Sequence, residues 1–321
     1  MRAFRLIFSA MALLIGTEAA MAQSTDAPMR LVTPYAAGGV GDAVLRMIAE
    51  GLHEGLRRPV IVENKAGASG RLGVEYVKHA TADGSVLLFT PIAPMAVFPH
   101  SYAQLSYDPR RDFEPITQVA AFDMAVAVGP QAPAKSLGEL VAWLKQNPGK
   151  GSYGTPGAGT LPHLCAVLFG RRAHLELLQV AYKGNPPGLA DLMGGHIPMF
   201  FTSTPDLVQA HKDGRLRILA TSGVKRSPML PEVPTFSEAG YDIQATGWYG
   251  LYAPARTPRA VIDDVNRRVV DLLRTERVRD RLLALGLSGA GTTPEQFARI
   301  QAESSSFWGE AVRTAGFKAD D

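Results

Sequence analysis

Length, composition and charge already narrow the class of protein. A chain of 321 residues is longer than one hydrophobic core usually organises, so two domains are expected. The formal net charge is only +3, and the basic residues are scattered, which argues against nucleic acid as a partner. The one cysteine, Cys165, excludes an internal disulfide and is expected to be a small buried residue.

The N-terminus is typical of an exported protein. Arg2 and Arg5 precede an apolar run over 6–15, and Ala20-Met21-Ala22 follows it. This layout predicts a cleavable signal peptide over 1–22 and a periplasmic location. The alternative is a membrane anchor, but the run is shorter than the roughly 18–20 apolar residues that span a bilayer.

The next segment predicts alternating strands and helices. Apolar runs at 31–32, 60–62 and 86–89 flank a helical pattern that begins at Asp42. Such alternation is typical of βαβ units with a parallel sheet, and therefore of an α/β fold. The helix has one apolar stripe at steps of three or four residues, formed by Leu45, Ile48, Leu52 and Leu56.

A second series of strands is expected from residue 125. Its predicted strands lie at 125–128, 178–180, 199–201 and 216–219. Between the first two, Ser136 and Glu139 form a capping box that starts a helix, and Asn147-Pro148-Gly149 ends it.

The C-terminal part predicts three helices around one strand. Thr235 and Glu238 repeat the capping-box pattern, which predicts a short helix ending at Gly240. A strand is expected over 248–252. Thr257-Pro258 and Thr293-Pro294 then open two longer amphipathic helices.

Three glycine-rich loops are the candidate ligand-binding segments, over 35–42, 63–73 and 153–163. Each joins a predicted strand to a helix, and in open α/β sheets ligands bind beyond the carboxyl ends of the strands. The first two loops belong to the first series and the third to the second, which favours a cleft between domains. Asp42 could equally be a helix-capping residue.

Catalytic and metal sites find little support in the residues. Ser69 lacks a nucleophile-elbow context, since Arg71 stands in place of the closing glycine. The histidines form no His-x-x-x-His pair, and the third loop lacks the Gly-Lys-Ser/Thr ending of a phosphate loop. No metal and no cofactor are expected. His163 could contact a ligand, or could cap or pack.

Many short motifs follow one another over nearly the whole mature chain. They include Gly38-Gly39-x-x-Asp42, Val62-Glu63-Asn64, Gly67-Ala68-x-Gly70-x-x-Gly73, Gly157-x-Gly159-Thr160-x-x-His163, Tyr182-Lys183-Gly184, Asp191-Leu192-x-Gly194-Gly195 and Trp248-Tyr249-Gly250. In these motifs and their order, the chain resembles the Bug-type extracytoplasmic solute receptors of tripartite tricarboxylate transporters.

The resemblance implies a two-lobed, type II periplasmic-binding-protein fold that closes around a ligand in the cleft between its lobes. Domain 1 is expected over 23–124 and 246–321, and domain 2 over 125–245. A carboxylate would be held by backbone groups and bound waters. The predicted ligand-binding residues are Tyr35, Gly38, Gly39, Asp42, Gly70, Thr155, Gly159, Thr160, His163, Tyr182 and Thr202.

The sequence departs from the family pattern at two positions. Ala37 stands where proline usually precedes the paired glycines, which should preserve the N–H groups of that loop. Thr202 stands where an aspartate is common. Because an aspartate there could bind an amino group, its absence weakens the case for an amino acid ligand.

The function expected from these features is a receptor and not an enzyme. It would capture a small organic acid for a transporter with one large and one small membrane subunit, as a monomer. An alternative is a ligand-loaded co-receptor that contacts a sensor protein. A hydrolase is a weaker alternative, because no nucleophile with an adjacent base is evident.

Overall fold

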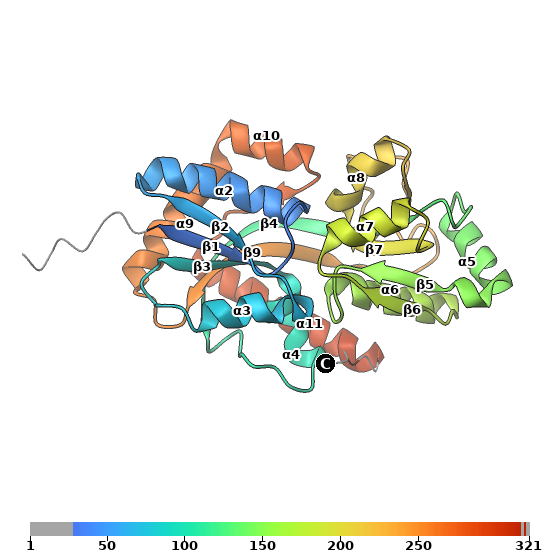
Figure 1. Ribbon diagram of the computed structural model, residues 1–321, viewed down its shortest axis with the longest axis horizontal. Helices are drawn as coiled ribbons and strands as arrows, with labels where there is room; N and C mark the ends of the chain where they lie inside the picture. The colour runs from blue at the N-terminus through green and yellow to red at the C-terminus, as the bar shows by residue number, and fades with distance from the viewer. Residues whose placement is uncertain (1–27, 316–317, 319–321) are drawn as a thin grey trace, which may run out of the picture.

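The computed structural model describes residues 28–315 and residue 318, so the expected signal peptide lies outside the described residues. Strands and helices alternate through most of the chain, and an α/β fold results (Figure 1). Within this described part, no helix combines the length and apolarity that a membrane crossing requires.

The strands are β1 (Met29–Thr33), β2 (Val60–Asn64), β3 (Val86–Pro91), β4 (Phe113–Val128), β5 (Ser152–Thr155), β6 (Leu178–Ala181), β7 (Met199–Ser203), β8 (Arg217–Thr221), β9 (Thr246–Pro254) and β10 (Ser288–Gly289). The longer helices are α2 (Val40–Leu56), α3 (Arg71–Lys78), α5 (Leu137–Gln146), α6 (Leu161–Ala173), α7 (Asn185–Met193), α8 (Thr204–Lys212), α9 (Arg259–Arg274), α10 (Glu276–Ala284) and α11 (Pro294–Ala315). Shorter turns are η1 (Ala68–Gly70), the π-helical η2 (Ala93–Val97), α4 (Phe98–Ser101) and η3 (Pro148–Lys150).

Strand β4 joins two groups of strands into one curled sheet. Its first part, Phe113–Asp123, pairs with β9, which leads through β3 and β1 to β2. Its last part, Met124–Val128, pairs with β7 on one side and β8 on the other, and β7 leads to β5 and β6. We call the β1–β2–β3 side the first lobe and the β5–β6–β7 side the second lobe. Figure 1 shows β4 and β9 running between them.

Helices cover both faces of the sheet because their apolar stripes need a partner surface. In the first lobe, α2 buries the predicted stripe at Leu45, Ile48 and Leu52, with Leu56 half-buried at its end. Helix α11 contacts η2, β4 and α4 and lies across the opposite face (Figure 1). Cys165 is fully buried in α6, as expected, and burial raises the pKa of its thiol to about 12.

The predicted capping boxes are present, but one of them does not start a helix. The Ser136 hydroxyl accepts from the Glu139 N–H, whereas the Glu139 carboxylate accepts from Lys135 rather than from Ser136. The Thr235 and Glu238 groups bond reciprocally, yet residues 236–240 form turns. The short helix expected there is wrong, because the segment after the cap is too short to add helical turns before Gly240.

Ser222 links chain segments by hydrogen bonds at the point where β4 passes from one lobe to the other. Its hydroxyl accepts from the Met124 N–H at 2.8 Å and donates to the Ala245 carbonyl at 2.6 Å, and its own N–H donates to the Met124 carbonyl. The side chain is fully buried. One residue therefore connects β4 with the segments that follow β8 and precede β9.

Replacing Ser222 with alanine is expected to lower the free energy of unfolding by roughly 2 kcal/mol, because two buried backbone groups lose their partner. The measurement is urea unfolding followed by circular dichroism. Ser106→Ala, at an exposed position, is the matched control and should change stability by less than about 0.5 kcal/mol. Equal stability of the two variants would contradict a structural role for the Ser222 hydroxyl.

Candidate functional site

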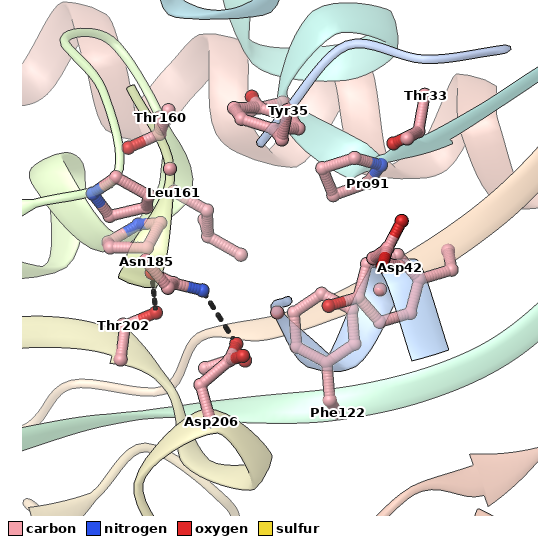
Figure 2. Close-up of a pocket in the computed structure, with 18 of the residues that line it drawn as sticks. Thr33, Tyr35, Asp42, Pro91, Phe122, Thr160, Leu161, Asn185, Thr202 and Asp206 are labelled. Atoms are coloured by element: carbon pink, nitrogen blue, oxygen red, sulfur yellow. Dashed lines mark hydrogen bonds between the residues drawn. The ribbon is translucent and has the colours of Figure 1, made fainter. Parts of the chain in front are cut away.

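A cavity lies where loops of the two lobes face each other (Figure 2). Its volume is about 80 Å³, counted as the space open to the centre of a water molecule. Residues from β1, the start of α2 and β3 line it on the first-lobe side. The starts of α6, α7 and α8 line it on the second-lobe side, with side chains of β4 and β9 between them.

The first-lobe wall is built by the loop after β1. Tyr35 and Gly39 line the cavity from this loop, with Thr33 at the end of β1 and Asp42 in the first turn of α2. The Tyr35 hydroxyl donates to the Ser69 carbonyl at 3.1 Å, and its burial raises the pKa of the phenol far above the usual range. The hydroxyl is therefore fixed as a neutral group that ties the first predicted loop to the second.

Asp42 is held by groups of its own lobe. Its carboxylate accepts from Arg46 at 2.9 Å, from Asn64 at 3.0 Å and from the Gly38 N–H at 3.2 Å. Burial alone would raise the pKa of this carboxyl, but the bonds from Arg46, Asn64 and Gly38 outweigh burial and lower it. Asp42 is thus ionised, and its charge is compensated by Arg46.

The second-lobe wall carries a chain of polar side chains. The Thr202 hydroxyl donates to the Asn185 side-chain oxygen at 2.6 Å, and the Asn185 amide nitrogen donates to Asp206 at 2.7 Å (Figure 2). Thr160 and Leu161, at the start of α6, complete this wall. The bonds fix the amide orientation of Asn185, because its oxygen and nitrogen each have one defined partner.

Asp206 reaches from α8 across to the first lobe. One carboxylate oxygen accepts from the Val40 N–H at 2.9 Å, at the N-terminus of α2. The other accepts from Asn185 and from the Ser203 hydroxyl. Burial raises the pKa of this carboxyl, and the bonds from Ser203, Val40 and Asn185 oppose that rise.

Aromatic side chains form the apolar part of the cavity between the lobes. The Phe89 and Tyr249 rings stack with centroids 5.3 Å apart, and Phe122 lies 4.5 Å from Tyr249. Phe122 and Leu161 point into the cavity from different sides in Figure 2. This surface favours an apolar body in any bound molecule.

The lobes also touch at the rim of the cavity. The Tyr102 hydroxyl of the first lobe donates to the Ala158 carbonyl of the third loop at 2.8 Å. At Gly157, an added Cβ would lie only 3.2 Å from Ser69. The second and third predicted loops therefore meet face to face, and this arrangement is closed.

Five of the predicted ligand-binding residues line the cavity, namely Tyr35, Gly39, Asp42, Thr160 and Thr202. The other six lie outside its wall, namely Gly38, Gly70, Thr155, Gly159, His163 and Tyr182.

The residues outside the wall support the loops that form it. The His163 ring nitrogen Nδ1 accepts from the Gly159 N–H at 3.0 Å. The Tyr182 hydroxyl donates to Asp191, and Gly70 packs against the Tyr35 ring, where an added Cβ would lie 3.2 Å away. These bonds and contacts hold the shape of the loops, and ligand contact by these six residues stays a prediction.

Sequence reasoning missed the polar residues Asn185, Ser203 and Asp206. Asp206 follows Thr204-Pro205 in the first turn of α8, where an acidic residue is the ordinary dipole-compensating choice. An aspartate at this place in the sequence therefore gives little sign of a role in the site. Among the buried aromatic side chains, Phe122 lines the cavity, whereas Phe201 and Trp248 lie in the core away from its lining.

Taken together, a two-lobed α/β frame with a cavity between facing loops is typical of a binding protein of the periplasmic type. Residues 44–317 match the model of the tripartite tricarboxylate transporter family receptor. The chain belongs to this family.

Two relatives in sequence cover almost all of the chain. A protein from the tcbD-tcbE intergenic region of Pseudomonas sp. strain P51 is 31% identical over 316 residues, covering 96% of this chain and 93% of the relative. The protein BugT of Bordetella pertussis is 30% identical over 293 residues, covering 91% and 90%.

Solved structures agree with the fold. The periplasmic binding protein BugD superposes with a TM-score of 0.87 at 31% identity, covering 91% of this chain and 98% of its own. An R. palustris protein solved with adipate gives 0.87 at 28% identity with the same coverage. MatC of Rhodopseudomonas palustris, with bound malate, gives 0.85 at 27% identity, covering 89% and 98%. The two-lobed fold, the receptor role and the periplasmic class predicted from the sequence are confirmed, and the chain is a solute receptor and not an enzyme.

The neutral His163 ring predicts an acid-sensitive stability. Burial lowers its pKa from 6.5 to about 4, so below pH 6.5 the unfolded chain takes up a proton that the folded chain does not. Stability is therefore expected to fall by roughly 3 kcal/mol as the pH drops from 6.5 to 4 through this group.

His163→Asn keeps an acceptor for the Gly159 N–H and removes the titration. Urea unfolding at a series of pH values should show a flatter decline for this variant than for the wild type. His79→Asn, at an exposed position, should leave the slope unchanged. A wild-type slope in the His163 variant would show that the ring does not carry the effect.

Proposed function

We propose that the protein captures a small carboxylate-bearing solute in the cavity between its lobes and delivers it to the membrane subunits of a tripartite tricarboxylate-type transporter. The observation that carries this proposal is the closed cavity, which facing loops of the two lobes line together. Two structural neighbours, solved with adipate and with malate, hold carboxylic acids on the same fold.

The chemistry of the cavity supports binding through backbone groups and water. Among the lining residues there is no lysine, arginine or histidine that could pair directly with a carboxylate. Helix α6 begins at Leu161 on the cavity wall. Pro162 has no N–H, and the N–H groups of Leu161 and His163 receive no side-chain cap from Thr160. Such N–H groups, with the positive end of the helix dipole, attract an anion.

Closure would couple binding to delivery. The bonds from Val40 to Asp206 and from Tyr102 to Ala158 form only when the lobes meet. A solute that contacts both walls would shift the population towards this closed form, which the membrane subunits would recognise.

We also propose how the chain is processed and divided into domains. The signal peptide over 1–22 would be removed on export. The lobes would correspond to domain 1 over 23–124 and 246–321 and domain 2 over 125–245, which agrees with the change of partners of β4 after Asp123. The receptor would act as a monomer with one large and one small membrane subunit. Contact with a sensor protein is the alternative output.

Filling the cavity should abolish binding without unfolding the receptor. Leu161 lines the cavity, and Leu161→Trp would place an indole in the space that the solute needs. For refolded mature protein, a carboxylate at a hundred times its dissociation constant should stabilise the wild type by roughly 2.7 kcal/mol. The variant should show no ligand-dependent shift in thermal unfolding.

Leu283→Trp on α10, where the leucine is 58% exposed, is the matched control and should respond to the same acid as the wild type. An undiminished shift in the Leu161 variant would place the binding site elsewhere. No response of the wild type to any carboxylate would contradict the proposed ligand class.

A further inference from the structure

The negative charges in the cavity wall are not all balanced by positive ones, and this imbalance affects which solute can bind. Among the described residues that line the cavity, Asp42 and Asp206 are the acidic ones and none is basic. Asp42 has Arg46 as its ion-pair partner. In the part of the chain that the structure describes, Asp206 forms no ion pair with a lysine, arginine or histidine. One negative charge in the wall is thus left without a positive one.

The hydrogen bonds of Asp206 favour its charged form. Its three partners are the Val40 N–H, the Asn185 amide nitrogen and the Ser203 hydroxyl, and all three donate to it. An ionised carboxylate accepts hydrogen bonds and donates none, so these three bonds favour the anion, although burial outweighs them and raises the pKa of Asp206 above its usual value. The positive end of the α2 dipole, at Val40, acts in the same direction.

Asp206 also occupies the place that an anionic solute would take on the first lobe. The N-cap of α2 is Gly39, which has no side chain to satisfy the first N–H groups. The Asp206 carboxylate, brought from the second lobe, accepts from the first of them. A solute carboxylate at this end of the cavity would have to displace Asp206 or lie beside a like charge.

We propose that Asp206 is a specificity-determining residue that selects solutes with a single carboxylate, carrying an amino group at the other end, over dicarboxylates of the same length. The solute carboxylate binds on the α6 side, near Leu161, and its ammonium group faces Asp206. This inference rests on the proposed function and narrows its substrate class.

The polar wall fits such an amino group. Thr202, which lines this wall, carries no charge of its own. Thr202 is connected through Asn185 to Asp206, so a carboxylate reaches the same wall from α8 instead. Figure 2 shows the Asp206 carboxylate on the cavity side of this chain of bonds.

The test compares acids of matched shape that differ only at the end remote from one carboxylate. Three sets serve: succinate, butanoate and 4-aminobutanoate; glutarate, pentanoate and 5-aminopentanoate; terephthalate, benzoate and 4-(aminomethyl)benzoate. Dissociation constants for refolded mature receptor are measured by calorimetry. In the set that binds, the amino acid should bind at least about tenfold more tightly than the diacid, because like charges in the cavity repel.

Asp206→Asn removes the charge and keeps an acceptor for the Val40 N–H. It should reduce that ratio at least about tenfold, mainly by improving binding of the diacid. Asp213→Asn, at an exposed position at the end of the same helix, should leave the ratio unchanged. If the Asp206 variant does not fold, the wild-type ratio still decides whether the cavity prefers the amino acid to the diacid.

The outcomes separate the two proposals. A diacid that binds the wild type as tightly as its amino counterpart overturns the selectivity and leaves the carboxylate receptor intact. An unchanged ratio in a folded Asp206→Asn variant overturns the role of Asp206. Binding of none of the acids overturns the carboxylate class itself, and the selectivity with it.

Discussion

The binding site exists because β4 is one strand with two sets of hydrogen-bonding partners. Through Asp123 it belongs to the first lobe, and from Met124 it belongs to the second. The polypeptide therefore cannot move one lobe without bending near this point, where Ser222 ties β4 to the return segment. The loops that line the cavity sit on either side of this crossing, so a bend there would open or close the cavity.

Closure brings together groups that belong to different lobes, and the most informative pair is the α2 N-terminus with Asp206. In a receptor for anions, free helix N-termini are the natural donors. Here one of them is already satisfied by the protein itself. The cavity is thus electrostatically asymmetric, because both the N-terminus of α6, which has no side-chain cap, and the Asp206 carboxylate lie in its lining. The aromatic surface of Phe89, Phe122 and Tyr249 between these ends suits the apolar body of a small acid.

Much of the fold could be predicted because its signals are local. The stripe of α2, the strand around Trp248 and the cap at Ser136 each depend on residues close in sequence. The full extent of β4 could not be predicted, because its polar and proline-containing first part reads as a loop until β9 pairs with it. The helix predicted after Thr235 does not form, because a correct cap does not by itself ensure a helix.

The site was predictable only in part, because some of its residues come together only in the folded structure. The glycine loops marked Tyr35, Gly39 and Thr160, whereas Asp206 acquires its role only when α8 meets α2 across the cavity. The most direct measurement is a crystal structure of the receptor with its tightest-binding acid. We expect the solute carboxylate near Leu161 and Asp206 still bonded to the Val40 N–H. A solute carboxylate at Val40, with Asp206 displaced, or a solute bound outside this cavity would contradict the account.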